Sequence, residues 1–125
     1  YAVTIENHGP WAAGAGSGSG ALLQSYLRLV RRSDAMLSTL LSQLAALERP
    51  ALLVFFGDHR PSIPGVTAPG GARHTPYVVM RLDGDGSLTR GGNRRVDLTP
   101  ADLHHVVLDT LLGAPSAERS TSPAA

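Results

Sequence analysis

The sequence predicts an α/β domain in which a mostly parallel sheet is flanked by helices. A long amphipathic pattern covers residues 21–47, an apolar run follows at 51–56, and a β-rich segment precedes both at 1–5. A long helix between two strands implies a right-handed crossover, and strands joined in this way are parallel. The carboxyl ends of segments 1–5 and 51–56 are then expected at one edge of the sheet.

The first segment, 1–5, alternates weakly and is partly β-branched, as strands are. A turn-rich stretch follows it. Residues 12–20 have the Gly, Ser and Ala composition of a mobile linker. Their glycine spacing does not fit the dinucleotide-binding fingerprint, and they do not directly follow the strand.

The helix pattern over 21–47 consists of apolar residues recurring at three and four positions. Ser19 is the expected N-cap, and Pro50 prevents the helix from continuing into the next segment. Asp34 falls on the apolar stripe, where its carboxylate lies either at the edge or hydrogen-bonded inside, in a structural role. The stripe consists of Leu23, Tyr26, Leu27, Val30, Leu37, Leu40, Leu41, Leu44 and Leu47.

The second half begins with a buried strand at 51–56 and a Pro- and Gly-rich loop at 61–75. Loops of that length tend to be lids or binding segments. Another strand is predicted at 77–82 and a hairpin-type turn at 83–86. The turn resembles half of a calcium loop, but the terminal Glu of such loops is missing.

The last predicted element is a helix with Thr99 as N-cap and Pro100 at its first position. It runs to Leu112 and ends at Gly113. The organisation is therefore one domain over 1–113 and a tail over 114–125, which is small, polar and expected to be disordered.

Composition excludes several classes of function. A net charge of +1 gives no electrostatic footprint for nucleic acid. With no cysteine, disulfides and thiolate metal sites are excluded. No apolar run approaches the ~18–20 residues of a membrane helix. The chain opens at Tyr1, inside a strand-like segment, so we expect it to be the C-terminal part of a longer protein.

The candidate site lies where the strand at 51–56 ends. Gly57 lets the backbone turn, and Asp58 and His59 follow at once. Ligands of open α/β sheets bind beyond the carboxyl ends of the strands, and a carboxylate with an imidazole can share a divalent metal. His8, at the end of the first segment, is expected nearby. The structural alternative is that Asp58 caps a turn and His59 faces solvent.

Four segments together resemble one known family in order and spacing. They resemble the sulfatase-like branch of the alkaline phosphatase superfamily, which includes lipoteichoic acid synthases and phosphoglycerol transferases, over roughly residues 1–113. Relatives of this type occur in bacterial capsule-biosynthesis clusters. The segments are Val3-Thr4-Ile5-Glu6-Asn7-His8-Gly9-Pro10-Trp11, Ser33-Asp34-Ala35-Met36-Leu37, Phe55-Phe56-Gly57-Asp58-His59-Arg60-Pro61 and Thr75-Pro76-Tyr77-Val78-Val79.

The resemblance implies an alkaline-phosphatase-like fold and a metal site. Asp58 and His59 match adjacent metal ligands, for manganese by preference, with zinc or magnesium as alternatives. His8 matches the histidine that contacts the phosphate group of the substrate or a second metal. Arg60 is assigned to substrate binding at the entrance of the same site, and His74 lies there without an assigned role.

Other conspicuous side chains are assigned to packing or to the surface. Trp11 and Tyr26 are expected to pack in the core, and His104 and His105 to lie on the terminal helix outside the site. The hydroxyl groups of the chain do not match the nucleophile of the family, which is a threonine or serine well upstream of His-Gly-Pro. That nucleophile and an acidic metal ligand are expected before Tyr1. The hydroxyls near the site are those of Thr4, Ser62 and Thr75.

The implied function is transfer or hydrolysis of phosphoglycerol-type phosphate esters, or of sulfate esters, in cell-envelope or capsular polysaccharide synthesis. The substrate is lipid- or glycan-linked. The parent is expected in a bacterial membrane, with its catalytic domain facing the periplasm or the exterior. The alternative is a catalytically incomplete remnant that acts as a metal-binding or scaffold domain. A calcineurin-type metallophosphoesterase needs a series of motifs that are absent here.

Overall fold

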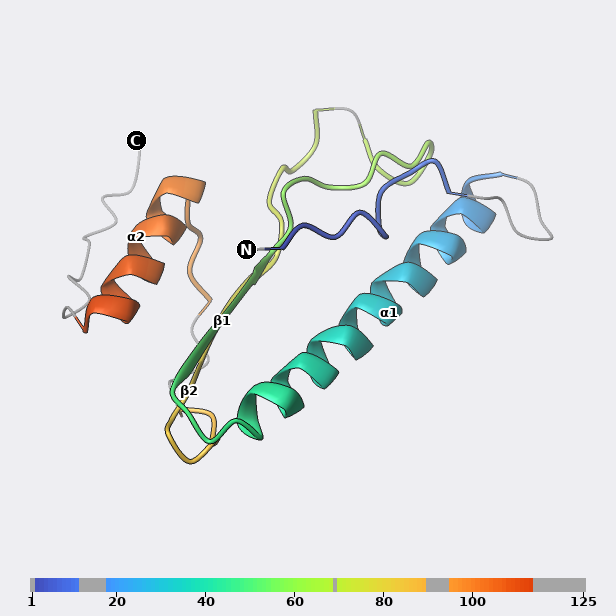
Figure 1. The fold of residues 1–125 in the computed structure, drawn as a ribbon. Helices are drawn as coiled ribbons and strands as arrows, with labels where there is room; N and C mark the ends of the chain where they lie inside the picture. The colour runs from blue at the N-terminus through green and yellow to red at the C-terminus, as the bar shows by residue number, and fades with distance from the viewer. Residues whose placement is uncertain (1, 12–17, 69, 90–94, 114–125) are drawn as a thin grey trace, which may run out of the picture.

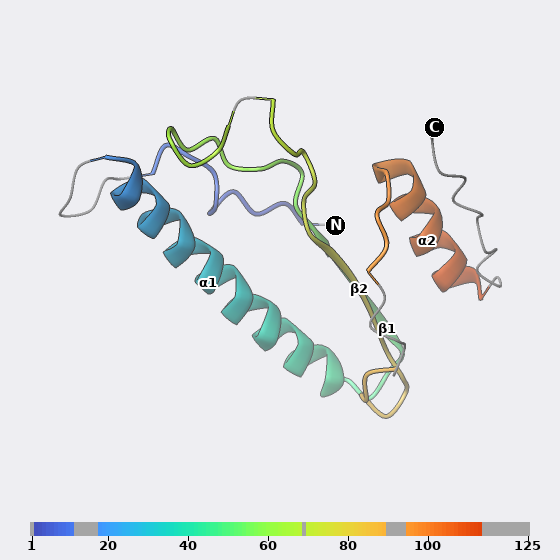
Figure 2. The ribbon, with the colours of Figure 1, turned by 180° about the vertical axis from the view of Figure 1, so that it is seen from behind.

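A computed structural model describes residues 2–11, 18–68, 70–89 and 95–113. The two strands pair with each other and lie between the two helices, with α1 along one side and α2 along the other (Figures 1 and 2). This mixture agrees with the α/β class that the sequence predicts. The elements in chain order are α1 (Ser19–Ala45), β1 (Ala51–Phe56), β2 (Tyr77–Leu82) and α2 (Pro100–Leu112).

Helix α1 begins and ends slightly earlier than the sequence predicts. Gly18 occupies the N-cap position without a side-chain cap, so the expectation that Ser19 caps the helix is wrong. The backbone of Ser19 is already helical. At the other end the helix stops at Ala45 and a turn follows, in which Glu48 has a positive φ of 48°. The turn redirects the chain into β1.

The most buried side chains of α1 are two serines. Ser25 and Ser33 are each 6% exposed, whereas Leu27 and Val30, predicted in the apolar stripe, are 38% and 36% exposed. The small serines allow other segments of the chain to approach the helix closely. Asp34 is exposed, in agreement with an edge position.

Strands β1 and β2 are antiparallel, with Ala51 opposite Leu82 and Phe56 opposite Tyr77. Beyond β2 the chain reverses in the predicted turn, where the Asp83 N–H donates to the Ser87 carbonyl at 2.8 Å. Leu82 is 1% exposed and is one of the two fully buried large side chains among the described residues.

The expected strand at 1–5 is not formed. Tyr1 lies outside the described residues, and 2–5 have no strand pairing. Val3 and Ile5 are 70% and 80% exposed, because no neighbouring strand covers or pairs with them among the described residues. The predicted parallel pairing of 1–5 with 51–56 is therefore absent here. The one pair of strands that the structure describes is antiparallel, since the segment between β1 and β2 folds back without a crossover helix.

The loop between the strands is irregular, as predicted, and its ends are tied together. The Thr75 hydroxyl donates to the Gly57 carbonyl at 2.6 Å, and the Gly57 N–H donates to the Pro76 carbonyl at 3.1 Å. Within the loop, Ile63 is 1% exposed and its N–H donates to the Thr67 hydroxyl at 2.7 Å. The first part of the loop is thus anchored by a buried side chain.

Helix α2 forms as the sequence predicts. Thr99 accepts a hydrogen bond from the Asp102 N–H and completes a capping box, and Pro100 occupies the first turn. Gly113 closes the helix in the left-handed conformation, with φ 67°. Neither α1 nor α2 has the length and apolarity of a membrane-spanning helix. The predicted tail, 114–125, and most of the predicted linker fall outside the described residues.

Candidate active site

The candidate site begins at Gly57, where β1 ends against the start of β2. A Cβ atom at this position would lie 3.3 Å from the Thr75 Cβ, closer than most such contacts in proteins. Glycine is thus needed here for close approach of the two backbones. The two hydrogen bonds between Gly57 and residues 75–76 hold this junction, and Asp58 and His59 follow it directly.

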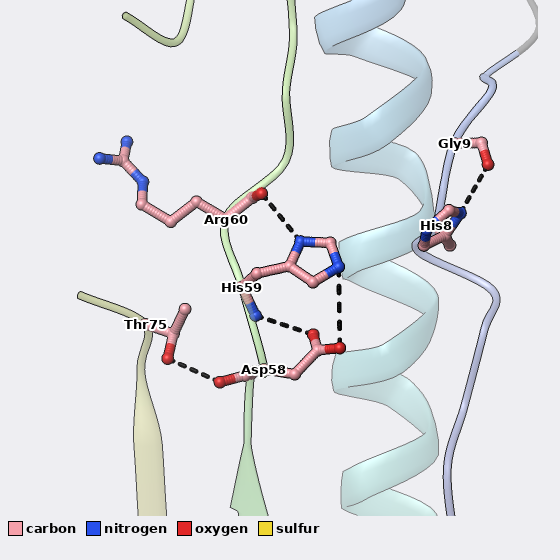
Figure 3. Close-up of polar contacts among 7 residues, drawn as sticks. His8, Gly9, Asp58, His59, Arg60 and Thr75 are labelled. Atoms are coloured by element: carbon pink, nitrogen blue, oxygen red, sulfur yellow. Dashed lines mark hydrogen bonds and ion pairs between the residues drawn. The ribbon is translucent and has the colours of Figure 1, made fainter. Parts of the chain in front are cut away.

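Asp58 and His59 form a compact pair. The Nε2 atom of His59 lies 3.7 Å from Oδ2 of Asp58, and the His59 N–H donates to Oδ1 at 2.8 Å (Figure 3). The side chains are 62% exposed for His59 and 83% exposed for Asp58. Asp58 does accept a backbone hydrogen bond, as the alternative interpretation expects, but its second oxygen faces the imidazole.

The imidazole rings of His8 and His59 each direct their Nδ1 atom at a backbone carbonyl. Nδ1 of His59 lies 3.0 Å from the Arg60 carbonyl, and Nδ1 of His8 lies 2.7 Å from the Gly9 carbonyl. Because a carbonyl can only accept, each Nδ1 carries the proton. In the tautomer that carries its proton on Nδ1, a ring presents the lone pair of Nε2, the arrangement that histidine ligands of metals usually have.

His8 lies beside this pair although it is distant in sequence. The ring centroids of His8 and His59 are 5.9 Å apart, with the planes at 86°. The predicted proximity is therefore confirmed, but a strand does not produce it. The turn that carries His8 is attached to α1 instead: Asn7 donates to the Ser33 hydroxyl at 2.9 Å, and Arg32 pairs with Glu6 at 3.3 Å.

The Asp58–His59 pair fits two positions of a metal coordination shell. Two ligand bonds of about 2.1 Å can span the 3.7 Å between the carboxylate oxygen and Nε2. A carboxylate with an imidazole suits manganese, zinc or magnesium better than softer metals. Within the described ranges no group of three or more His, Cys, Asp or Glu is placed to hold an ion.

Arg60 does not join the other three predicted residues. Its side chain extends away from His8 and the His59 ring (Figure 3), and its guanidinium donates to the Ala72 carbonyl at 2.7 Å. His74 is exposed. His104 and His105 contact each other on α2, with centroids 5.8 Å apart. Trp11 packs edge-on against Tyr26 at 5.6 Å, in agreement with its predicted packing role.

Sequence reasoning missed three residues that position the site. Asn7 and Ser33 hold the His8 turn against α1, and the Thr75 hydroxyl closes the junction at Gly57. Thr75 was predicted only as an available hydroxyl. An Asn directly before His-Gly-Pro is a signal for a side chain that organises the turn, because Asn commonly bonds to nearby groups in turns. No sequence signal identifies Ser33 as its partner.

The chain is similar in sequence to a known protein and to a known family. The chain is 30% identical over 103 residues to the capsular polysaccharide biosynthesis protein RkpI of Rhizobium meliloti (strain 1021). The matched region is 82% of this chain and 19% of that relative. The chain thus spans about a fifth of the relative's length. No solved structure is significantly similar to it. The family model for sulfatases matches residues 1–114. The chain therefore belongs to the sulfatase family.

Proposed function

We propose that this chain is the C-terminal portion of a metal-dependent, sulfatase-like enzyme. The enzyme transfers or hydrolyses phosphoglycerol-type phosphate esters, or sulfate esters, in the synthesis of envelope or capsular polysaccharide. The observation that carries the proposal is the convergence of Asp58, His59 and His8 beyond the end of β1. The sulfatase family and the similarity to a capsular polysaccharide biosynthesis protein support the class of substrate.

Asp58 and His59 are proposed as metal ligands, manganese being preferred and zinc or magnesium being alternatives. When bound, such an ion supplies Lewis-acid stabilisation of charge on an ester oxygen. Two donors are fewer than the four or more that these ions take. The remaining ligands and the threonine or serine nucleophile are therefore proposed to lie outside residues 1–125. The full domain is proposed to complete the mostly parallel, alkaline-phosphatase-like sheet.

His8 is proposed to bind the ester group itself. Its Nδ1–H is directed at the Gly9 carbonyl, so a protonated His8 would donate from Nε2 to a non-bridging oxygen of a phosphate or sulfate. Its ring lies 5.9 Å from that of His59, centroid to centroid, so the proposed ester contact lies beside the proposed metal ligand. Phosphate and sulfate esters are nearly isosteric, so these three side chains accept either one.

The substrate is proposed to be lipid- or glycan-linked, and the parent to be anchored in the bacterial membrane with its catalytic domain outside the cytoplasm. Membrane fractionation and protease accessibility of the full-length protein in cells test this location. Recovery of the protein in the soluble cytoplasmic fraction would contradict it.

The central experiment measures manganese binding and ester turnover by the full-length protein. Asp58→Asn and His59→Gln should each reduce manganese affinity at least ~10-fold, as loss of a ligand does. Asp85→Asn and His105→Gln are matched controls, since Asp85 is exposed in the turn at the opposite end of the β1–β2 pair and His105 is exposed on α2. Reporter substrates are a p-nitrophenyl phosphate monoester, the corresponding diester and the sulfate.

The outcomes separate the enzyme from its alternative. Turnover that requires Asp58 and His59 supports the enzyme, and the preferred reporter identifies the ester class. Manganese binding without turnover of any ester supports a metal-binding or scaffold domain. Equal metal affinity in the two site variants and the two controls would show that the assigned ligand pair is wrong.

A further inference from the structure

We infer that Arg60 and Arg73 form a second, anion-binding subsite, which holds an acidic group on the part of the substrate that does not react. This inference rests on the proposed function, because it assigns a substrate feature to the neighbourhood of the proposed ester site. It changes the role expected for Arg60, from binding the ester at the entrance of the site to binding a separate anion.

The subsite is an open pocket of about 410 Å³ along the loop after β1. Its volume lies within the ~300–1,000 Å³ range of small-molecule sites. Asp58 and His59 line it together with residues of the strand-connecting loop. Small residues such as Gly70 and Ala72 line the wall and leave room for a sugar ring. The pocket is therefore continuous with the proposed metal ligands.

The charged groups of the pocket favour an anion. Two arginines, Arg60 and Arg73, are among the lining residues, together with Ser62. Its one carboxylate is that of Asp58, which is already engaged with His59. No acidic side chain in the described part of the chain forms an ion pair with either arginine. Guanidinium groups bind carboxylate, phosphate and sulfate oxygens in pairs.

The Arg60 side chain lies apart from the position proposed for the reacting ester. Arg60 extends to the opposite side of the chain from the His59 ring (Figure 3). Its bond to the Ala72 carbonyl uses one of the five N–H donors of the guanidinium and fixes the group against the pocket wall. An ester held between His8 and His59 would thus leave both arginines free to contact another group of the same molecule.

The ligand predicted from this chemistry is an acidic sugar, in which a carboxylate, phosphate or sulfate stands on a ring next to the reacting ester. The Ser62 hydroxyl supplies a hydrogen bond to a sugar ring, and the arginines supply the charge. The bound group is predicted to remain chemically unchanged, since the guanidinium of Arg60 extends away from the His59 ring (Figure 3).

Binding of acidic monosaccharides to the full-length protein in EDTA tests the inference. Glucuronate, glucose 6-phosphate and glucose 6-sulfate distinguish the three kinds of anion, and glucose is the neutral control. We expect at least one acidic sugar to bind by isothermal titration calorimetry, with an affinity that falls as salt increases. Arg73→Gln should weaken this binding about tenfold.

Two further variants keep the result interpretable. Arg28→Gln removes a guanidinium from the exposed surface of α1 and should leave binding unchanged. Arg60→Lys keeps the charge and can still reach a carbonyl, but loses the paired donors, so it should weaken binding less than Arg60→Gln. Equal affinity in native protein and Arg73→Gln, or no binding of any acidic sugar, would overturn the subsite.

Failure of the subsite and failure of the proposed function remain distinguishable. In EDTA the measurement does not depend on metal or on turnover, so an enzyme with the proposed activity and no subsite would cleave reporters yet bind no acidic sugar. Conversely, acidic sugar binding that depends on Arg73, without reporter cleavage, would support the subsite and contradict the enzymatic proposal.

Discussion

The imidazole rings of His8 and His59 meet edge to face, with their centroids 5.9 Å apart and their planes at 86°. They come from two segments that share no strand pairing in the described residues. His59 is placed by the end of β1, whereas His8 is placed by contacts of its neighbours Glu6 and Asn7 with α1. The geometry of the proposed site therefore depends on the face of a helix as much as on the sheet.

The bond between Asn7 and Ser33 is predicted to be a stabilising contact. Ser33→Ala leaves the Asn7 amide without this partner in a part-buried position, and we expect a loss of about 1–3 kcal/mol in the free energy of unfolding. Ser38→Ala is the matched control, because it makes the same change on the exposed face of the same helix. Urea unfolding followed by circular dichroism measures both. Equal stability of the two variants would show that the bond contributes nothing.

The turn after β2 is predicted to tolerate one Gly→Ala change and not the other. A Cβ on Gly86 would overlap the Ala45 carbonyl at the end of α1, and this glycine has a φ of 78°. Steric overlap and left-handed strain together should cost at least ~2 kcal/mol. Gly84→Ala places its Cβ 3.9 Å from Pro50, an ordinary contact, and should change stability by less than ~1 kcal/mol. Thermal unfolding of the two variants compares them directly.

The pKa of Asp85 is held below its ordinary value, chiefly by the side-chain hydrogen bond with Ser87 and also by a backbone hydrogen bond from Ser87. A carboxyl whose pKa is lower in the folded state stabilises the fold above its unfolded pKa, and this contribution is lost as the pH falls through the folded pKa. Ser87→Ala should therefore raise the pKa of Asp85. A carbon-detected NMR titration of the side-chain carboxyl measures it, with Ser38→Ala as control. An unchanged pKa in Ser87→Ala would contradict this cause.

The helical cap of α2 shows what local sequence can predict. Thr99, Pro100 and Gly113 each act through their own backbone or through residues three positions away, so no knowledge of the rest of the fold is needed. The bounds of β1 and β2 also follow from short apolar runs between breakers. These predictions are confirmed because the forces that define them are local.

The predictions that were wrong have a common physical cause: they concern residues whose structure depends on partners distant in sequence. Segment 1–5 has strand-like residues, but a strand needs a neighbour for its hydrogen bonds, and sequence pattern does not supply one. Leu27 and Val30 follow the helical period, yet the serines at 25 and 33 are the buried positions, and Ser33 is contacted by Asn7 from a distant segment. The direction of the Arg60 side chain likewise depends on the Ala72 carbonyl across the loop.

We predict that His59 serves metal binding and that His8 serves ester binding. His59→Gln removes an Nε2 that lies 3.7 Å from Asp58, so manganese affinity and turnover should fall together. His8→Gln should retain manganese affinity within about threefold, while kcat/KM for the preferred reporter ester falls ~10²-fold, as loss of a charge-assisted contact to the reacting group does. Calorimetry with manganese and steady-state kinetics on the same preparations measure the two effects. If His8→Gln loses manganese as completely as His59→Gln, then His8 is itself a metal ligand, and the 5.9 Å between the rings must contract around the ion.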